Sequence, residues 1–324
     1  MDSEMISGSA LERLLYAGRF VVCAEMCPPM GADKAAVLKK CDFFRSVVDA
    51  VNVTDNQAAI ARMSSLMTCV FAREGGLEPI LQLTCRDRNR LAQQSEVLSA
   101  SAAGIRNLLC LTGDHQSCGN HPDAKGVFDL DSIQLLHMVA GMNAGRFLCG
   151  DEIKPPPRLF LGGAANPFAE PMEMRVMRLA KKIQAGARFI QTQPVFDISR
   201  FEKWMAAVRD EGLHEQAYIL AGVMPVKSTR SLVYIKERVP GMRIPGEIFA
   251  RMLAARDPRE EGIEICVETI AQLGTLPGVK GVHIMTAMWE SIIPRVVEEA
   301  GLLPRLDLPA PGQDISQTIG GASR

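Results

Sequence analysis

The sequence has no apolar run of transmembrane length, and residues 1–15 lack the basic start and apolar core of a signal peptide. It also has little excess charge. The 36 basic and 37 acidic side chains give a formal net charge of −1, which argues against recruitment to nucleic acid or an anionic membrane by bulk charge. We therefore expect a cytoplasmic protein with no membrane and no nucleic-acid partner.

Paired cysteine motifs are absent as well. The nine cysteines are scattered without a Cys-x-x-Cys pair, which is typical of reduced thiols packed as small hydrophobic side chains and not of an iron–sulfur site. The one group with metal-ligand spacing is Cys110, His115, Cys118 and His121. Because Cys110 belongs to an apolar run and Cys118 precedes a Gly-Asn turn, we expect no metal there.

Eight short apolar runs alternate with helical patterns along the chain, which is 47% hydrophobic. The runs span residues 20–26, 50–55, 78–86, 108–114, 159–166, 188–193, 218–226 and 281–287. Helical patterns begin at Asp33 and then occupy 64–74, 89–103, 131–142, 171–185, 201–211, 229–239, 246–255, 263–273 and 292–300.

This alternation predicts α/β architecture in the form of a single (β/α)8 TIM barrel over residues 1–301, with extra helices before the last strand. Residues 302–324 are rich in Pro, Gly and Ser and are predicted to form a mobile tail. An open, doubly wound sheet is the alternative. It has less support, because no Gly-x-Gly-x-x-Gly motif follows the first run.

Polar side chains gather where the apolar runs end, and the carboxyl ends of barrel strands are where such enzymes bind their ligands. The set comprises Glu25, Thr54, Asp55, Thr84, Arg86, Thr112, Asp114, Asn166, Gln191, Gln193, Lys227 and Thr286. Only His115 adds an imidazole, so the set differs from the ligands of a metal-dependent hydrolase or lyase. Hydroxyls and amides instead suit hydrogen bonding to a flat heterocyclic cofactor.

Glu25 is the most informative single residue because it lies near the end of an apolar run, between Ala24 and Met26. Burial of a carboxyl group raises its pKa and makes it a usable general acid near neutral pH. The alternative is a structural ion pair with an Arg or Lys of a neighbouring loop.

In this order, the motifs at the strand ends resemble those of the methylenetetrahydrofolate reductase family. They are Glu25-x-x-Pro-Pro, Asn52-Val-Thr-Asp55, Leu83-Thr-Cys85, Leu111-Thr-Gly-Asp114, Lys182-x-x-Ala-Gly-Ala187, Gln191-Thr-Gln193 and Gly222-x-x-Pro-Val226. The resemblance covers about residues 20 to 300. The stretches NVTDNQ, CRDRNR and TGDHQ are similar to the short form of the acetyl-CoA pathway and other anaerobic one-carbon metabolism.

The resemblance implies a flavin-dependent oxidoreductase that reduces 5,10-methylenetetrahydrofolate, or a related pterin carrier, to the 5-methyl form. It implies that Glu25 is the general acid that protonates the folate and opens its five-membered ring. Asp114 would then hydrogen-bond the pterin and shape the flavin's electrostatics, Gln193 would orient the folate, and Thr54 would lie against the flavin ring. The positions that match flavin- and phosphate-binding residues are Gln82, Thr112, Gly113, Asn166 and Lys182.

Departures from the family pattern bear on the cofactor and the electron donor. Asn166, Glu170 and Arg175 replace residues common on the dinucleotide half of the flavin site, so FMN is an alternative to FAD. Ser228-Thr229 stands where an aromatic is common, which favours a donor other than free NAD(P)H, such as a reduced partner protein. The rival interpretation is a flavin- or pterin-binding subunit of a larger electron-transfer complex, without independent turnover. A homo-oligomer is also expected.

Overall fold

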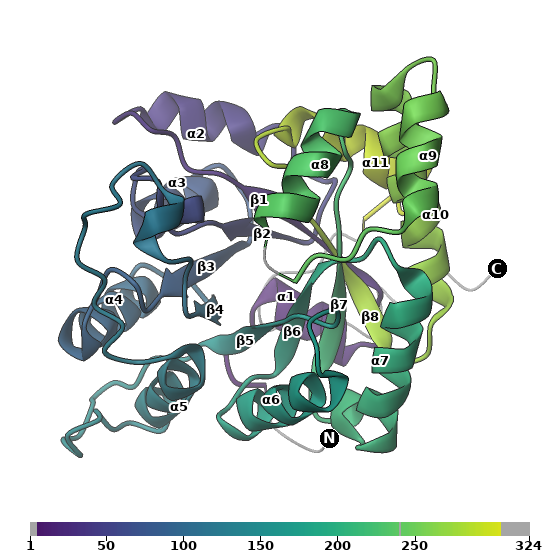
Figure 1. Ribbon diagram of the computed structural model, residues 1–324. Helices are drawn as coiled ribbons and strands as arrows, with labels where there is room; N and C mark the ends of the chain where they lie inside the picture. Colours follow the sequence, from purple (N-terminus) through teal and green to yellow (C-terminus); the bar gives the residue numbers. More distant parts are fainter. Residues whose placement is uncertain (1–4, 240, 306–324) are drawn as a thin grey trace.

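The computed structural model describes residues 5–239 and 241–305, so most of the tail predicted at 302–324 lies outside the described residues. Eight parallel strands close into a barrel in chain order, with β1 paired to both β2 and β8 (Figure 1). The strands are β1 Val21–Met26, β2 Ala50–Val53, β3 Pro79–Thr84, β4 Asn107–Leu111, β5 Phe160–Ala165, β6 Phe189–Pro194, β7 Tyr218–Val223 and β8 Val279–Ile284. The predicted TIM barrel is confirmed.

Helices surround the barrel and follow the strands in sequence (Figure 1). They are α2 Lys34–Cys41, α3 Ser65–Glu74, α4 Arg90–Ala102, α5 Ser132–Asn143, α6 Met172–Gln184, α7 Ile198–Asp210, α10 Pro258–Thr275 and α11 Ile293–Glu299. Side-chain caps start most of these helices, as the side-chain oxygens of Asp33, Ser64, Asn89 and Asp131 accept backbone N–H bonds. No described helix is long and apolar enough to cross a membrane.

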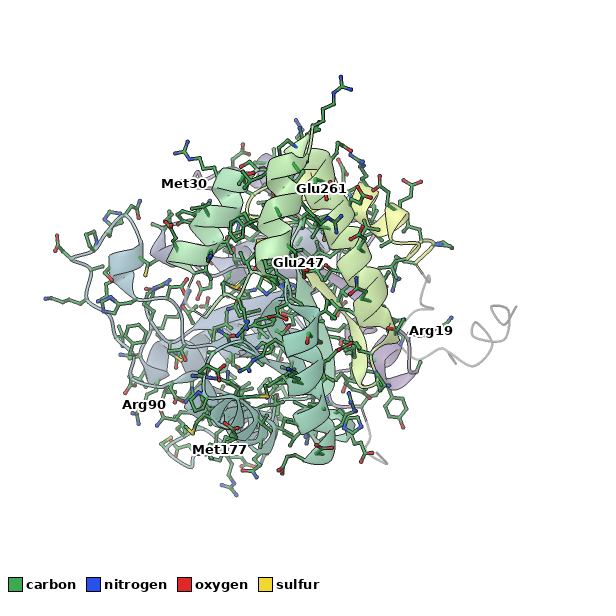
Figure 2. The ribbon with its side chains drawn as sticks, turned by 45° about the vertical axis from the view of Figure 1, so that its right-hand side comes forward. Arg19, Met30, Arg90, Met177, Glu247 and Glu261 are labelled. Atoms are coloured by element: carbon green, nitrogen blue, oxygen red, sulfur yellow. The ribbon has the colours of Figure 1, made fainter. Side chains whose placement is uncertain are left out.

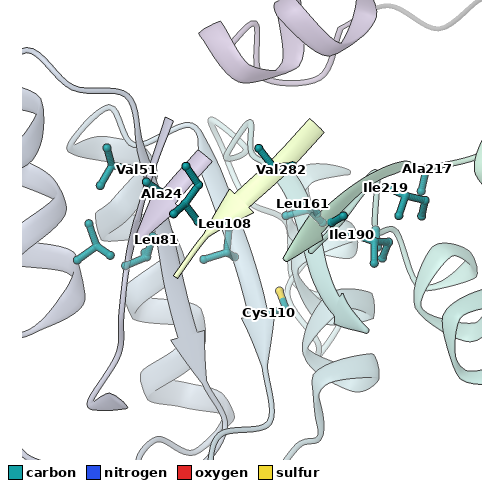
Figure 3. Close-up of a cluster of buried hydrophobic side chains, with 14 of the residues drawn as sticks. Ala24, Val51, Leu81, Leu108, Cys110, Leu161, Ile190, Ala217, Ile219 and Val282 are labelled. Carbon is teal, nitrogen blue, oxygen red and sulfur yellow. The ribbon is translucent and has the colours of Figure 1, made fainter. Parts of the chain in front are cut away.

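The main core lies between the barrel and its helices, where the outward-facing strand residues are buried. Alternate residues of a strand point to opposite faces, so this core takes one residue in two from each strand. Figure 3 shows Ala24, Val51, Leu81, Leu108, Cys110, Leu161, Ile190, Ile219 and Val282 in this layer. All of these side chains are at most 2% exposed, so the helices fix the strands that carry the mouth of the barrel.

A second core fills the lower half of the barrel interior and is closed by helix α1, Ala10–Tyr16. Leu11, Leu14 and Leu15 of α1 pack against inward-facing strand residues, among them Phe160 and Phe189, whose rings stack 5.1 Å apart. Helix α1 was not predicted, because seven residues show little more than one helical repeat. Its signals are the Ser9 N-cap and the Leu spacing.

Two further helices, α8 Thr229–Arg238 and α9 Gly246–Ala254, lie between β7 and α10 (Figure 1). Arg251 of α9 donates to Glu261 (2.7 Å) and Glu268 (2.6 Å) of α10, so the two helices run side by side (Figure 2). Helix α10 begins five residues before its predicted start at 263, because Asp257 caps it and Pro258 occupies its first turn.

Candidate active site

The upper half of the barrel interior is polar, in contrast to the apolar floor. Asn52 of β2 and Gln191 of β6 exchange two amide hydrogen bonds across it, at 2.7 and 3.0 Å. This fully satisfied pair is buried and forms the base of the mouth. Glu25, Gln82 and His283 also point inward, from β1, β3 and β8.

The Glu25 side chain is 13% exposed and lies near the amide of Gln82, which favours its ionised form. Burial, together with the smaller effect of the negative charge of Glu290, raises the pKa of Glu25 to about 7, although the Gln82 amide acts in the opposite direction. Among the described residues no Lys or Arg lies within ion-pair distance of Glu25. The structural ion pair considered for this residue is therefore wrong for the described part of the chain.

His283 was not singled out from the sequence, although it is an imidazole within the apolar run 281–287. Its Nε2 lies 3.9 Å from Glu25 Oε1, and its Nδ1 is buried without a hydrogen-bond partner. Burial lowers the pKa of His283 to about 3, so the imidazole is neutral at physiological pH.

Some residues predicted at the strand ends form the framework of the mouth instead of facing it. The carboxylate of Asp55 accepts from the Thr84 backbone N–H (3.0 Å), the Thr84 hydroxyl (2.8 Å) and the Arg88 guanidinium (2.7 and 3.2 Å). These bonds join the ends of β2 and β3 to the start of α4. Asp55 is 1% exposed as a side chain, so it is occupied structurally.

Arg86 has a similar structural part. Its buried guanidinium donates to the backbone oxygens of Asn56 (3.1 Å) and Asp114 (3.2 Å) and to the carboxylate of Asp87 (2.8 Å). It therefore connects the loops that follow β2, β3 and β4. The carbonyl of Asp114 is fixed in this way while its carboxylate stays exposed.

The turn after β4 brings backbone close to β3. Gly113 has φ +90°, and a Cβ there would lie 3.0 Å from Thr84 Cβ and 3.2 Å from Arg86 Cβ. A side chain at Gly113 would therefore be strained by the positive φ and would crowd Thr84 and Arg86. Thr112 is held by its hydroxyl, which accepts the Ser132 N–H at the start of α5 (3.3 Å).

Lys182 of α6 lies behind the end of β5, where its Nζ donates to the Ala164 carbonyl (2.5 Å). Burial and the neighbouring Arg178 lower the pKa of Lys182 to about 8, and no carboxylate of the described residues pairs with it. Asn166 closes the turn after β5, because its Oδ1 accepts the Phe168 N–H (2.9 Å). A desolvated ammonium without a counter-ion is a receptor for an anion such as phosphate.

Two predicted residues, Thr54 and Gln193, keep polar atoms available. The Thr54 hydroxyl is buried and has no hydrogen-bond partner. Gln193 is half-buried as the last residue but one of β6, and the Thr192 hydroxyl donates to its carbonyl (2.9 Å). No hydrogen bond joins Glu25 to Asp114 within the described residues.

Beside the mouth, the loops after β2 and β8 hold several non-glycine residues at positive φ: Asn56, Ala58, Ala59, Ala287 and Met288. Arg62 connects these loops, since it donates to the Pro28 carbonyl (3.2 Å) and to Met288 Sδ (3.5 Å). A cleft of about 520 Å³ opens next to Arg62 between α2 and α3. Its lining includes Met63, Met67, Phe71 and Met30, and Met30 stands at the surface (Figure 2).

The candidate metal ligands are dispersed. Cys110 is buried in β4, whereas Cys118 and His121 are exposed in the following loop. Across residues 5–239 and 241–305, no three His, Cys, Asp or Glu side chains form a group suited to a metal ion.

The model of the methylenetetrahydrofolate reductase family matches residues 10–301. The chain belongs to this family. The match spans the barrel together with α1 and α11. The Glu25 and Asp114 motifs lie at strand ends within it, on β1 and after β4.

Curated methylenetetrahydrofolate reductases are similar at low identity. The Schizosaccharomyces pombe enzyme 1 is 24% identical over 235 residues, 70% of this chain and 36% of that protein. The probable NADPH enzyme of Caenorhabditis elegans is 27% identical over 299 residues, 90% of this chain and 39% of that protein. This chain thus spans about two fifths of the length of these relatives. The Pectobacterium carotovorum 5,10-methylenetetrahydrofolate reductase is 24% identical over 219 residues, 66% of this chain and 67% of that protein.

A solved structure shares the fold. An uncharacterized Clostridium thermocellum protein, described as binding two copies of 5-methyl-5,6,7,8-tetrahydrofolic acid, has a TM-score of 0.64 at 12% identity. The alignment covers 90% of this chain and 97% of that one. At this identity the likeness concerns the barrel alone.

Proposed function

We propose that this chain reduces 5,10-methylenetetrahydrofolate to 5-methyltetrahydrofolate with a bound flavin. The observation that carries the proposal is Glu25, a carboxyl group whose pKa burial raises to about 7 at the mouth of a barrel of this family. Among the described residues it has no cationic partner. Its proton is therefore available to a substrate instead of being replaced by an ion pair.

The product defines the task of the acid. The methyl group of the product is on N5, so the bond between the bridging carbon and N10 must break, and N10 must gain a proton. Glu25 supplies this proton, and the amide of Gln82 hydrogen-bonds the carboxylate that remains. The bridging carbon, now an iminium carbon on N5, is open to hydride.

The mouth fits a flavin in three respects. The Thr54 hydroxyl is buried without a partner, Gly113 permits close approach over β3 and β4, and Lys182 offers a partly desolvated positive charge. A bound flavin would supply the hydride for the iminium carbon. We assign Thr54, Gln82, Thr112, Gly113, Asp114, Asn166 and Lys182 to holding it, with FAD as the cofactor and FMN as the alternative.

The remaining roles concern the folate. The exposed carboxylate of Asp114 and the half-buried amide of Gln193 offer hydrogen bonds to the pterin's amino and ring nitrogens. The Clostridium thermocellum neighbour, which has the same barrel, is described as binding 5-methyl-5,6,7,8-tetrahydrofolic acid. This supports a reduced folate as the ligand class.

Glu25→Gln separates the two half-reactions. The amide retains the side-chain volume but has no proton to give, so flavin reduction should proceed while reoxidation by methylenetetrahydrofolate slows by about 10²- to 10⁴-fold. Stopped-flow absorbance follows both steps. Equal losses in the two half-reactions, or unchanged reoxidation, would show that Glu25 is not the acid.

Glu78→Gln is the matched control. Burial also raises the pKa of Glu78, but this residue precedes β3 at the opposite end of the barrel and hydrogen-bonds Asn107 (2.6 Å). The rates of both half-reactions should remain close to those of the wild type in this variant.

A further inference from the structure

Lys40 and Glu290 are far apart in sequence, but both contact the backbone of Cys27, two residues beyond Glu25. Lys40 of α2 and Glu290, in the short 3₁₀ turn Glu290–Ile292 after β8, form an ion pair at 2.5 Å. Lys40 Nζ also donates to the carbonyl of Cys27 (2.8 Å), and Glu290 Oε1 accepts the N–H of Cys27 (3.3 Å). The pair therefore holds both backbone polar groups of one residue.

The contacts of Lys40 and Glu290 with Cys27, here called the clamp, lie where β1 no longer pairs with its neighbouring strands. The pairing of β1 with β2 ends at Met26 and Val53, and that with β8 ends at Ala24 and Ile284. Pro28 and Pro29 follow, and proline has no N–H to donate. Cys27 is thus the last residue whose N–H can anchor the strand that carries Glu25.

Glu290 also contributes a negative charge near the Glu25 carboxyl group. That group faces His283 from β8 and Gln82 from β3, and it senses Glu290 and Cys27. Burial leaves His283 and the Cys27 thiol uncharged near neutral pH. The nearby charged groups are therefore Glu290 and its partner Lys40, with Arg62 next to Cys27 and Pro28.

We propose that Lys40 and Glu290 are positioning residues for Glu25: they fix the end of β1 and balance the charge beside the proton donor. The inference rests on the proposed role of Glu25 as the acid. An unpaired Glu290 would raise the pKa of Glu25, and an unpaired Lys40 would lower it. The pair keeps Glu25 able to give a proton and to regain it.

The two halves of the pair predict opposite pH shifts, which a purely structural role would not produce. Glu290→Gln removes the negative charge and leaves Lys40, so the pH at which folate-linked reoxidation falls to half should drop by about one unit. Lys40→Met leaves Glu290 unpaired, so that pH should rise by a similar amount. The double variant should return close to the wild-type profile.

A control pair lies on the outer helices. Arg251→Met and Glu268→Gln break an ion pair of 2.6 Å between α9 and α10, and neither should move the profile. Lys40→Met leaves a buried charge and is the variant most exposed to misfolding. Glu290→Gln keeps an acceptor for the Cys27 N–H. If Lys40→Met does not fold, a downward shift of the half-rate pH in Glu290→Gln by itself tests the positioning role of the pair.

An infrared pH titration of the protonated Glu25 carboxyl band, assigned by its loss in Glu25→Gln, gives a readout without turnover. Opposite shifts of its midpoint in the two variants support the positioning pair even if no variant reduces folate, in which case only the proposed function fails. Equal shifts, or none, overturn the positioning pair even where wild-type turnover and the Glu25→Gln defect are as expected.

Discussion

The Nε2 of His283 lies 3.9 Å from Oε1 of Glu25, and the two groups face each other without charge across a wide pH range. Burial lowers the pKa of His283 to about 3 and raises that of Glu25 to about 7. Between these values neither group carries a charge, so the contact is not an ion pair. Glu25 should therefore lower the free energy of unfolding as the pH rises, and His283 should lower it as the pH falls.

Glu25 should destabilise the fold in alkaline solution. Its folded-state pKa of about 7 exceeds the ordinary 4.5, so folding favours the protonated form, and stability is lost as the pH rises from 4.5 through 7. At pH 8.5 the loss is about 3 kcal/mol. Urea unfolding of Glu25→Gln and wild type at pH 5 and 8.5 should show the variant gaining stability relative to wild type at the higher pH. A pH-independent difference would contradict this.

His283 should destabilise the fold in acid. Its folded-state pKa of about 3 lies below the ordinary 6.5, so the unfolded chain takes up a proton first, and stability is lost as the pH falls from 6.5 through 3. At pH 5 this loss is about 2 kcal/mol. His283→Gln removes it, so the free energies of unfolding of variant and wild type should converge or cross between pH 7.5 and 5. Parallel pH curves would refute the assignment.

Lys182→Met should weaken binding of phosphate-bearing flavins. A charge-assisted hydrogen bond contributes roughly 1.5–3 kcal/mol, so the Kd of FMN or FAD should rise about 10- to 100-fold. Flavin fluorescence quenching measures this, and riboflavin, which lacks phosphate, should bind equally to both proteins. Lys181→Met is the matched control, because Lys181 is exposed on the same helix. Equal losses for riboflavin and FMN would place Lys182 away from the phosphate.

Asp55→Asn should destabilise the chain by about 3 kcal/mol, because it leaves the partly buried Arg88 guanidinium with only the more distant carboxylate of Glu96, at 3.8 Å. Asp42→Asn breaks an ion pair with Arg45 whose side chains are 64% and 52% exposed, and such pairs contribute at most about 1 kcal/mol. Urea unfolding of both variants at pH 7 compares them. Similar losses would mean that the Asp55 contacts are not the anchor described.

NADH should reduce the flavin of the isolated chain slowly. The Ser228 hydroxyl caps α8 by accepting the Ser231 N–H (3.2 Å), and Thr229 follows it, so neither offers an aromatic face for a nicotinamide. Trp289 is 5% exposed and lies beside Lys227 and Arg259. Anaerobic mixing with NADH, with dithionite as the reference reductant, measures the rate. Reduction as fast as turnover would refute this prediction.

The barrel was predictable because each strand is a short apolar run with turn residues after it. The predicted ends of the strands were less accurate. The run at 78–86 was predicted as a strand throughout, but β3 stops at Thr84, whose N–H and hydroxyl donate to the Asp55 carboxylate. Polar residues at a strand end carry no sign of whether they stay in the ladder.

The site was predictable only where a single residue broke a local pattern. Glu25 stands out as a carboxyl group within an apolar run, but the sequence left open whether it forms an ion pair, because a cationic partner would come from another loop. Asp55 and Arg86 looked similar in sequence, yet their contacts come from other loops. Lys40 and Glu290 meet across 250 positions, and no local pattern marks either one.

Helix α1 closes the amino end of the barrel, and the Phe160–Phe189 stack fills the interior above it. In the described part of the chain, the mouth is therefore the one way in for electron donor, folate and the water that returns a proton to Glu25. The electron donor and the folate must therefore bind at the mouth one after the other. A bound folate obstructs the proton's return, so each cycle must release its product before the acid is ready again, and double-reciprocal rate plots for the two reactants should run parallel.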